Sequence, residues 1–213
     1  DVERSRGLGD VYKRQERVAG SAHRIDQATL EAYRYDDINR VLNFVPGVYV
    51  REEDGFGLRP NIGLRGASAD RSAKVTLMED GILLGPAPYS APAAYFFPLS
   101  ARMTGIEVFK GPASIQHGPQ TIGGAINMIS APVPESFEST ALAMVGSNGY
   151  RRAHLRAGGR GESLGWLGEF VHLGSDGFKD LDGGGDTGFD KNEFVGKGEW
   201  DVGSGRLRLR VSY

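Results

Sequence analysis

The chain has 213 residues, of which 39% are hydrophobic, and a formal net charge of −2. This length suits one large domain or two small ones, and the near-neutral charge argues against nucleic acid as the main partner. Cysteine is absent, which excludes disulfide and thiol chemistry. No run approaches the ~20 apolar residues of a transmembrane helix, but transmembrane β-strands of about 10 alternating residues fit the composition.

The first 15 residues contain no apolar segment of the secretory-signal type and no helical or strand period. They are either a disordered natural leader or a foreign junction, and we favour the junction. The composition changes near residues 131–137, where closely spaced Gly and Pro turns give way to longer alternating strands. We therefore predict an unstructured or foreign leader (residues 1–15), a first domain (residues 16–134) and a second domain (residues 135–213).

Two short helices are predicted at the start of the first domain. Asp26 is a suitable N-cap for a helix that ends at Tyr33. Asp36 is the expected N-cap of a stronger helix, which Pro46-Gly47 ends. The apolar residues of this second helix follow the i, i+3, i+4, i+7 spacing of one helical face: Ile38, Val41, Leu42 and Val45.

Short strands make up the rest of the first domain. They are expected at residues 48–51, 61–65, 74–79, 82–84, 105–110 and 125–130. Asp80-Gly81 is a strong two-residue hairpin signal between two of these strands. Residues 85–98 contain too many prolines for a regular element. Together, the short strands and helices predict a small α+β domain.

The second domain alternates polar and apolar side chains with a period of two. The clearest alternation is that of Arg206, Arg208 and Arg210 with the apolar residues between them, and further strands are expected at residues 140–146, 150–157, 164–174 and 193–202. Aromatic residues along these strands include Trp166, Phe170, Phe194, Trp200 and Tyr213. Either transmembrane barrel strands or a soluble antiparallel sheet with one wet face explains this pattern.

The connections between these strands differ in length. Residues 147–149 and 203–205 are tight turns, whereas residues 175–191 form a long polar loop. Short turns on one side and long loops on the other are typical of outer-membrane barrels, which favours the barrel interpretation. Because five strands cannot close such a barrel, and the chain stops within its best strand, we expect the second domain to be the first part of a larger barrel.

Several motifs occur in the order and spacing of a known family. They are DINRVLNFVPGVYV, NIGLRG, LMEDGIL and IEVFKGPASIQHGPQTIGGAINMIS. From about Val18 to its end, the chain resembles the TonB-dependent outer-membrane receptors, whose N-terminal plug domain lies inside a β-barrel. The segments LRPNIGLRG, GPAPYSAPAAYFFP and SDGFKDLDGGGDTGFD look most like the ferric-citrate receptor branch.

The resemblance implies a function in active transport. Such receptors have about 22 strands and take up scarce ligands, usually ferric siderophores, with no cofactor and no enzymatic activity. Energy reaches them through TonB, with ExbB and ExbD in the inner membrane, and TonB binds a short N-terminal segment by strand addition. That segment is expected just before Val18, where the sequence has no convincing match.

The resemblance also suggests roles for individual plug residues. Arg65, with Glu107 and Lys110 as lesser candidates, is expected to pair with barrel carboxylates and lock the plug, the alternative being a solvated arginine. The loops expected to face an external ligand are residues 52–60, 86–97 and 116–120. An anionic ferric chelate suits the forked guanidinium groups of arginines, and other polar groups, that lie on or near these loops. The candidates for ligand binding are Arg59, Arg71, Tyr89 and Gln120.

Other chemistries have less support in the sequence. His117 has no second ligand at metal-binding spacing. We expect Asp182, Asp186 and Asp190 to lie in a solvated loop, and the alternative is a calcium-binding loop. No nucleophilic or paired-carboxylate set has supporting context, so an enzyme is not expected. The alternatives to ferric-chelate uptake are uptake of a non-iron ligand and a protein that binds ligand or signals without transport.

Overall fold

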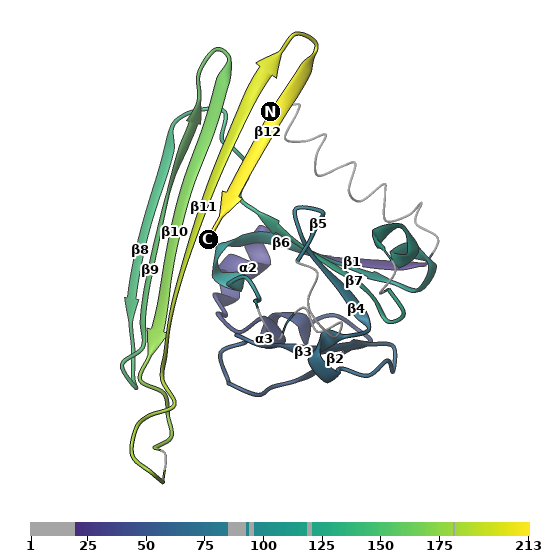
Figure 1. Ribbon diagram of the computed structural model, residues 1–213, viewed down its shortest axis with the longest axis vertical. Coiled ribbons are helices and arrows are strands. Elements are labelled where there is room, and N and C mark those ends of the chain that lie inside the picture. The colour runs from purple at the N-terminus through teal and green to yellow at the C-terminus, as the bar shows by residue number, and fades with distance from the viewer. Residues whose placement is uncertain (1–19, 85–92, 94–95, 119–120, 181) are drawn as a thin grey trace. The chain divides into compact units, whose positions relative to one another are not determined.

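The computed structural model describes residues 20–84, 93, 96–118, 121–180 and 182–213. The chain divides into two compact units, residues 1–130 and 131–213 (Figure 1). The expected leader, and the expected loop at residues 85–98 apart from residues 93 and 96–98, lie outside the described residues. Within the described part of the chain, no helix is long and apolar enough to cross a membrane.

Both predicted helices of the first unit are present. Helix α2 (Gln27–Tyr33) begins at the predicted cap, because the Asp26 carboxylate accepts a hydrogen bond of 2.9 Å from the Thr29 amide. Helix α3 (Ile38–Leu42) begins one residue later than predicted and ends at Leu42, before the predicted end at Pro46-Gly47. Its cap is Asp37, whose carboxylate accepts from the Asn39 amide at 2.8 Å, whereas the Asp36 carbonyl accepts from the Ser100 hydroxyl.

The first unit contains a mixed sheet of five strands in the order β1-β6-β7-β4-β5. Only the β4–β7 pair is parallel. A separate antiparallel pair joins β2 and β3. The strands of the unit are β1 (Ser21–Ile25), β2 (Val48–Arg51), β3 (Asn61–Leu64), β4 (Val75–Glu79), β5 (Ile82–Leu83), β6 (Met103–Lys110) and β7 (Gly124–Ser130). Short 3-10 turns are η1 (Asp70–Ser72), η3 (Ser100–Arg102) and η4 (Gly111–His117).

Three details of the first unit test the strand predictions. The Asp80-Gly81 hairpin is confirmed, since both residues have the positive φ (51° and 79°) of a type I′ turn. The strand predicted at residues 61–65 ends at Leu64, because Arg65 has a left-handed φ of 52°. Strand β1 was not predicted, since SAHRI has no apolar alternation and is a strand by its pairing with β6.

The core of the first unit is formed between the sheet and the helices. It combines apolar residues of α3 with inward side chains of β3, β4, β6 and β7. Burying each such aliphatic side chain stabilises the fold by about 1.5–3 kcal/mol. The fully buried members include Leu42, Ile62, Leu64, Val75, Ile106, Val108, Ile126 and Met128.

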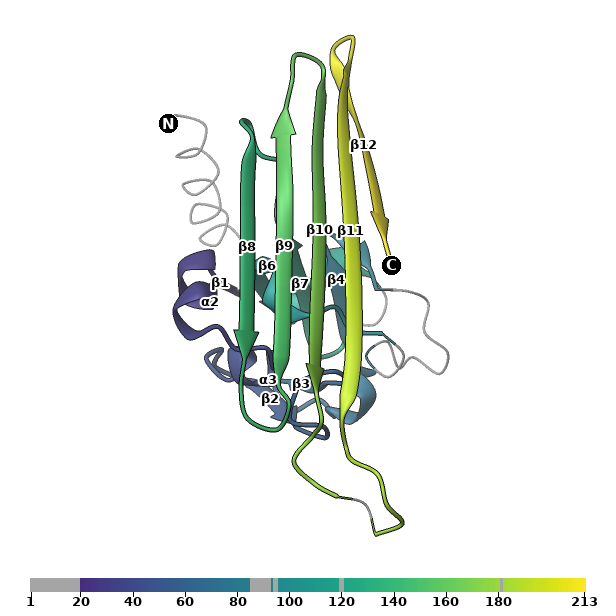
Figure 2. The same ribbon diagram turned by 90° about the vertical axis from the view of Figure 1, so that its left-hand side faces the viewer.

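The second unit is an antiparallel meander. Its five strands pair in chain order, each with the next (Figure 2). The strands are β8 (Glu138–Val145), β9 (Arg151–Arg160), β10 (Leu164–Ser175), β11 (Phe189–Val202) and β12 (Gly205–Ser212). Pairing of consecutive strands is local in sequence, which is why the alternation pattern predicted it.

The two faces of this meander differ in chemistry. The register aligns Leu155 with Phe170 and Phe170 with Phe194, so apolar side chains share one face, which we call the apolar face. All five predicted aromatic residues belong to this set. The opposite, charged face has arginines, lysines and glutamates from β9, β11 and β12, including Arg156, Lys197 and Arg208.

The predicted sorting of turns by side is wrong. The turn at residues 146–150 lies at the same end of the sheet as the long loop at residues 176–188, because the Asp176 amide donates to the Asn148 carbonyl at 2.9 Å. The other end has the short connections at residues 161–163 and 203–204 (Figure 2). In a meander, alternate connections lie at the same end, so position in the chain, and not length, decides their side.

Candidate functional site

Arg71 lies in a strained turn that two buried polar side chains hold in place. Arg71 and Ser72 have left-handed φ values of 52° and 54°. The Ser72 hydroxyl donates to the Pro60 carbonyl at 2.9 Å and accepts from the Ile62 amide at 3.0 Å, while the Asn61 side chain accepts from the Arg71 amide at 2.8 Å. Asn61 and Ser72 are 1% and 0% exposed. Strain maintained in this way is typical of functional positions.

The turn brings Arg71 close to a second arginine and a shared carboxylate. Glu53 lies 3.4 Å from the Arg51 guanidinium and 3.9 Å from that of Arg71, and Asp70 lies 3.7 Å from Arg51. All four side chains are substantially exposed. The sequence analysis named only Arg71, although the charged run Arg51–Asp54 was a signal for the others. Two arginines that share one exposed carboxylate are able to exchange it for an anionic ligand.

Arg59 follows a loop that Asp54 organises. The Asp54 carboxylate accepts hydrogen bonds from the amides of Phe56 and Gly57 (both 2.7 Å), Leu58 (3.3 Å) and Arg59 (3.0 Å). These bonds fix the backbone, while the Arg59 side chain is exposed. The other two ligand candidates, Tyr89 and Gln120, lie outside the described residues.

Asp37 lies behind this loop and has a perturbed pKa. Its side chain is buried, and a Cβ on Gly57 would lie 2.5 Å from its Oδ1, so the loop closes over it. Burial raises the pKa of Asp37, and the negative charges of Glu52 and Asp54 raise it further, against the Asn39 amide bond and Arg40, which lower it. Within the described part of the chain, its Oδ2 has no hydrogen-bond partner.

This shift gives a testable pH dependence. A carboxyl group with a raised folded-state pKa contributes stability below its ordinary pKa, and loses it as the pH rises through the raised value. We therefore expect Asp37→Asn to raise the free energy of unfolding of the first unit at about pH 7 and to change it little at about pH 4. Chemical denaturation of the full-length protein at both pH values measures the difference.

The control for Asp37 is a carboxylate with the opposite shift. The hydrogen bonds from Thr29 lower the pKa of Asp26, so its contribution is present above its ordinary pKa and is lost as the pH falls through the lowered value. Asp26→Asn is expected to reduce stability at about pH 7 instead of raising it. If both variants changed the free energy of unfolding in the same direction at neutral pH, the opposite pKa shifts assigned to Asp37 and Asp26 would be contradicted.

Two of the predicted lock residues lie together. The Lys110 ammonium donates to the Pro46 carbonyl at 2.7 Å, and burial and the charge of Arg65 lower the pKa of Lys110. The Arg65 guanidinium lies against Gly111, where a Cβ would be 2.7 Å from its Nη1. Among the described residues, no carboxylate pairs with Arg65 or Lys110. The structure therefore presents two neighbouring cations without a counter-ion in the described part of the chain.

The third predicted lock residue, Glu107, has partners of its own. It lies 3.6 Å from Arg24 of β1 and accepts a hydrogen bond of 3.1 Å from Asn127 of β7. These contacts connect β1, β6 and β7. Glu107 is an odd number of positions from Lys110, so the two side chains point to opposite faces of β6.

A buried ion pair in the first unit was not predicted from the sequence. Arg102 of η3 binds both oxygens of Glu79 at the end of β4, with one contact of 2.9 Å and a second, shorter one. Both residues are 2% exposed. Nothing in the local sequence distinguishes them from surface charges. The two residues are 23 positions apart in the chain and come together only in the folded unit.

On the charged face of the second unit, two basic side chains of β9 have acidic neighbours. The His154 ring lies 2.8 Å from the Glu169 carboxylate, and Arg160 pairs with Glu199. Arg152, His154 and Arg156 belong to the same face. Basic and acidic side chains of neighbouring strands therefore lie side by side on this face.

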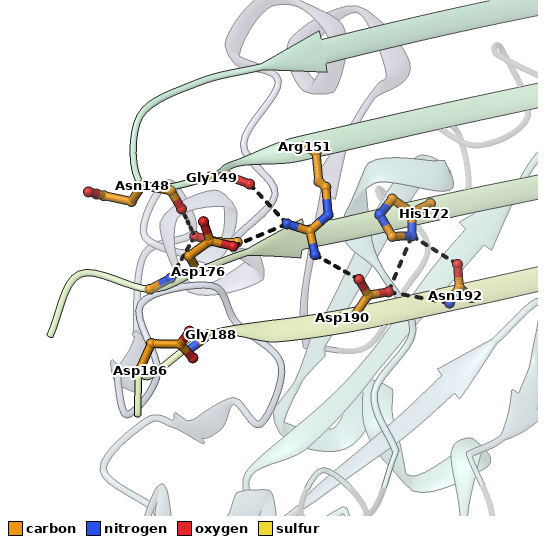
Figure 3. Close-up of polar contacts among 11 residues, drawn as sticks. Asn148, Gly149, Arg151, His172, Asp176, Asp186, Gly188, Asp190 and Asn192 are labelled. Carbon is orange, nitrogen blue, oxygen red and sulfur yellow. Dashed lines mark hydrogen bonds and ion pairs between the residues drawn. The ribbon is translucent and has the colours of Figure 1, made fainter. Parts of the chain in front are cut away.

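A second polar cluster lies at the loop end of the sheet (Figure 3). Arg151 donates to Asp190 at 2.9 Å and to Asp176 at 3.3 Å, and His172 lies 2.9 Å from Asn192. Asp186, another member of the alternative calcium loop, accepts from the Gly188 amide. Since Asp190 is engaged by arginine, the cluster connects strand ends, and no group of metal-binding side chains occurs among the described residues.

These features define a class of protein. An α+β unit with arginine-bearing turns precedes a meander with one apolar and one charged face, which is the arrangement of a plug domain followed by barrel strands. The family model "TonB-dependent Receptor Plug Domain" matches residues 14–125, more than half of the chain. The chain belongs to this family.

Comparisons with individual proteins agree with the family. A vitamin B12 transporter, BtuB, from Photobacterium profundum is 30% identical over 143 residues, which are 67% of this chain and 23% of that protein. The siderophore receptor PirA from Acinetobacter baumannii has a TM-score of 0.72 at 18% identity, over 93% of this chain and 32% of that one. The ferric yersiniabactin uptake receptor FyuA from Yersinia pestis also has a TM-score of 0.72 at 18% identity, with 91% and 31% covered. The chain therefore spans a third or less of these relatives and shares their fold.

Proposed function

We propose that the full-length protein is an outer-membrane receptor for TonB-dependent uptake of a ferric chelate, with the plug gating a barrel. The observation on which this rests is the plug match followed by a meander with an apolar aromatic face and a charged face. We further propose that the complete barrel has about 22 strands. TonB, with ExbB and ExbD, would supply energy through strand addition to a segment before the plug.

We propose ferric citrate, or a similar carboxylate-rich siderophore, as the ligand. The motif likeness to the ferric-citrate branch supports this choice, together with the exposed guanidinium groups of Arg59 and Arg71. Arg51 joins them as a third cation, and Glu53 acts as the counter-ion that the ligand displaces. Arginine suits this role because its planar fork matches a carboxylate. Tyr89 and Gln120 stay candidates from the sequence.

We also propose that Arg65 and Lys110 lock the plug. Two adjacent cations without a carboxylate in the described part of the chain suit acidic groups on the barrel wall. Lys110 is 5% exposed, so removing such a partner would leave a charge poorly compensated, which makes the pair a candidate switch. Glu107 would act indirectly, by joining β1 to β6 through Arg24.

Uptake by cells that produce the full-length receptor tests the function. Radiolabelled ferric citrate is expected to enter in a saturable manner, and deleting TonB is expected to abolish entry while leaving binding unchanged. Binding without TonB-dependent entry would support the alternative of a binding or signalling protein. The 30% identity to a vitamin B12 transporter favours a second candidate, a non-iron ligand, which uptake of labelled cyanocobalamin in place of iron would establish.

Matched variants test the ligand site. Arg59→Ala and Arg71→Ala are each expected to weaken ferric citrate binding about tenfold. Glu53→Gln should strengthen it about two- to fivefold, because an exposed ion pair costs little to break and its loss frees the arginine. Glu52→Gln removes the same charge one residue away and should have a smaller effect. Unchanged affinity in both alanine variants would remove this site assignment.

A further inference from the structure

The segment that follows the plug is bound to the charged face of the sheet. Ala131 and Val133 are buried against Leu167 of β10, and Pro132 between them is exposed. The Lys197 ammonium of β11 donates to the Ala131 carbonyl at 2.8 Å. The segment at residues 131–134 is therefore held by an apolar contact and by a charge-assisted hydrogen bond.

Two glycines of the sheet make this close approach possible. A Cβ on Gly165 would lie 2.8 Å from a methyl carbon of Val133, and a Cβ on Gly158 would lie 2.9 Å from Pro134. Both distances are shorter than carbon atoms tolerate, so any larger residue would displace the segment. The two glycines form a gap in the charged face that residues 133 and 134 fill.

The segment is stiff as well as bound. Pro132 and Pro134 have restricted φ angles, and each biases the residue before it toward an extended backbone. Neither proline has an N–H group, so the segment cannot add to the sheet as another strand. One residue further on, Glu135 lies 3.1 Å from the Arg160 guanidinium at the end of β9.

We propose that residues 131–134 are a fixed tether, which stays on the charged face of β9, β10 and β11 while the receptor transports its ligand. Any rearrangement of the plug then begins on the N-terminal side of Ala131, and the last plug strand remains attached through a rigid connection. The part of this proposal that concerns transport rests on the proposed function. The contact of residues 131–134 with the sheet in the resting protein does not depend on that function.

Thiol reactivity in the full-length receptor tests the tether without disturbing the glycine gap. The chain has no cysteine, so Val133→Cys and Pro132→Cys each introduce a thiol unique to this region. The buried position should react about tenfold more slowly than its exposed neighbour, and the ratio should stay the same during energised uptake. Faster labelling at position 133 during uptake, or equal labelling at rest, would overturn the proposal.

A cross-link provides the second test. Val133→Cys with Gly165→Cys is expected to form a disulfide, because the sulfur at position 133 takes the place of the methyl group that lies 2.8 Å from a Cβ at position 165, and a bonded pair does not displace the segment as an unbonded side chain would. Uptake by the oxidised receptor should equal uptake after reduction, and loss of uptake that reductant restores would overturn the tether. The control pair, Ala22→Cys with Phe109→Cys, joins β1 to β6 within the plug. If no variant transports any ferric chelate but the 133–165 bond forms at rest, the proposed function fails and the resting tether stands.

Discussion

Arg102→Met is expected to lower the free energy of unfolding of the plug by about 3–5 kcal/mol, because it removes the guanidinium that binds both oxygens of the buried Glu79 carboxylate. Both residues are 2% exposed, and the guanidinium binds both carboxylate oxygens. Glu79 ends β4, which lies between β7 and β5, so the loss should spread to the parallel pair. Hydrogen exchange of the β4 and β7 amides in the full-length receptor measures the change.

Two controls separate this effect from a general loss of charge. Arg51→Met also removes an arginine from an ion pair, but Arg51 is 56% exposed and should cost no more than about 1 kcal/mol. The double variant Arg102→Met with Glu79→Leu removes both buried charges, and should recover much of the loss. Equal costs for Arg102→Met and Arg51→Met would show that the buried pair has no special role.

Leu155→Arg is expected to destabilise the full-length receptor in lipid by about 2–4 kcal/mol, the cost of arginine on the lipid face of a barrel near the bilayer midplane. Leu155 lies on the apolar face, beside Phe170, and its side chain is 52% exposed. An arginine there would have to lose its hydration or distort the bilayer. Denaturant unfolding of receptor inserted in lipid vesicles measures the cost.

The neighbouring residue supplies the matched control. His154 precedes Leu155 on β9 and points to the charged face, 2.8 Å from Glu169. His154→Arg places a guanidinium beside that carboxylate, on the face that already has charged side chains, and should cost less than Leu155→Arg. If both substitutions cost the same, the two faces do not differ as a barrel requires. If Leu155→Arg is tolerated, the apolar face does not contact lipid.

Local patterns in the sequence predicted much of the architecture. The cap at Asp26, the Asp80-Gly81 hairpin and the alternating strands of the meander each depend on residues close together in the chain, where propensity and periodicity act directly. The same locality explains why the plug motifs identified the family. The predicted cap at Asp36 was wrong by one residue, because Ser100, distant in sequence, binds the Asp36 carbonyl.

The candidate site was only partly predictable. Arg65 was predicted as the arginine of NIGLRG, and Arg71 as a cation near a ligand-facing loop. The Glu53 counter-ion, the proximity of Arg65 to Lys110 and the strained backbone at η1 appear only in the structure. Each depends on contacts between segments that local patterns do not relate. The placement of the turn at residues 146–150 beside the long loop follows from the direction of the strands and not from the length of either connection.

By itself, the sequence determined the family, the α+β character of the plug and the two-faced strands, because these follow from short-range periodicity and from motifs. Only the tertiary structure revealed the Arg102–Glu79 pair and the docking of residues 131–134 into a glycine gap. Burial converts an ordinary arginine and glutamate into a strongly coupled pair, and close packing converts two glycines into a binding surface. The first effect arises because burial removes water from around the charges, and the second because close packing leaves no room for a side chain. Neither can be read from a local sequence pattern.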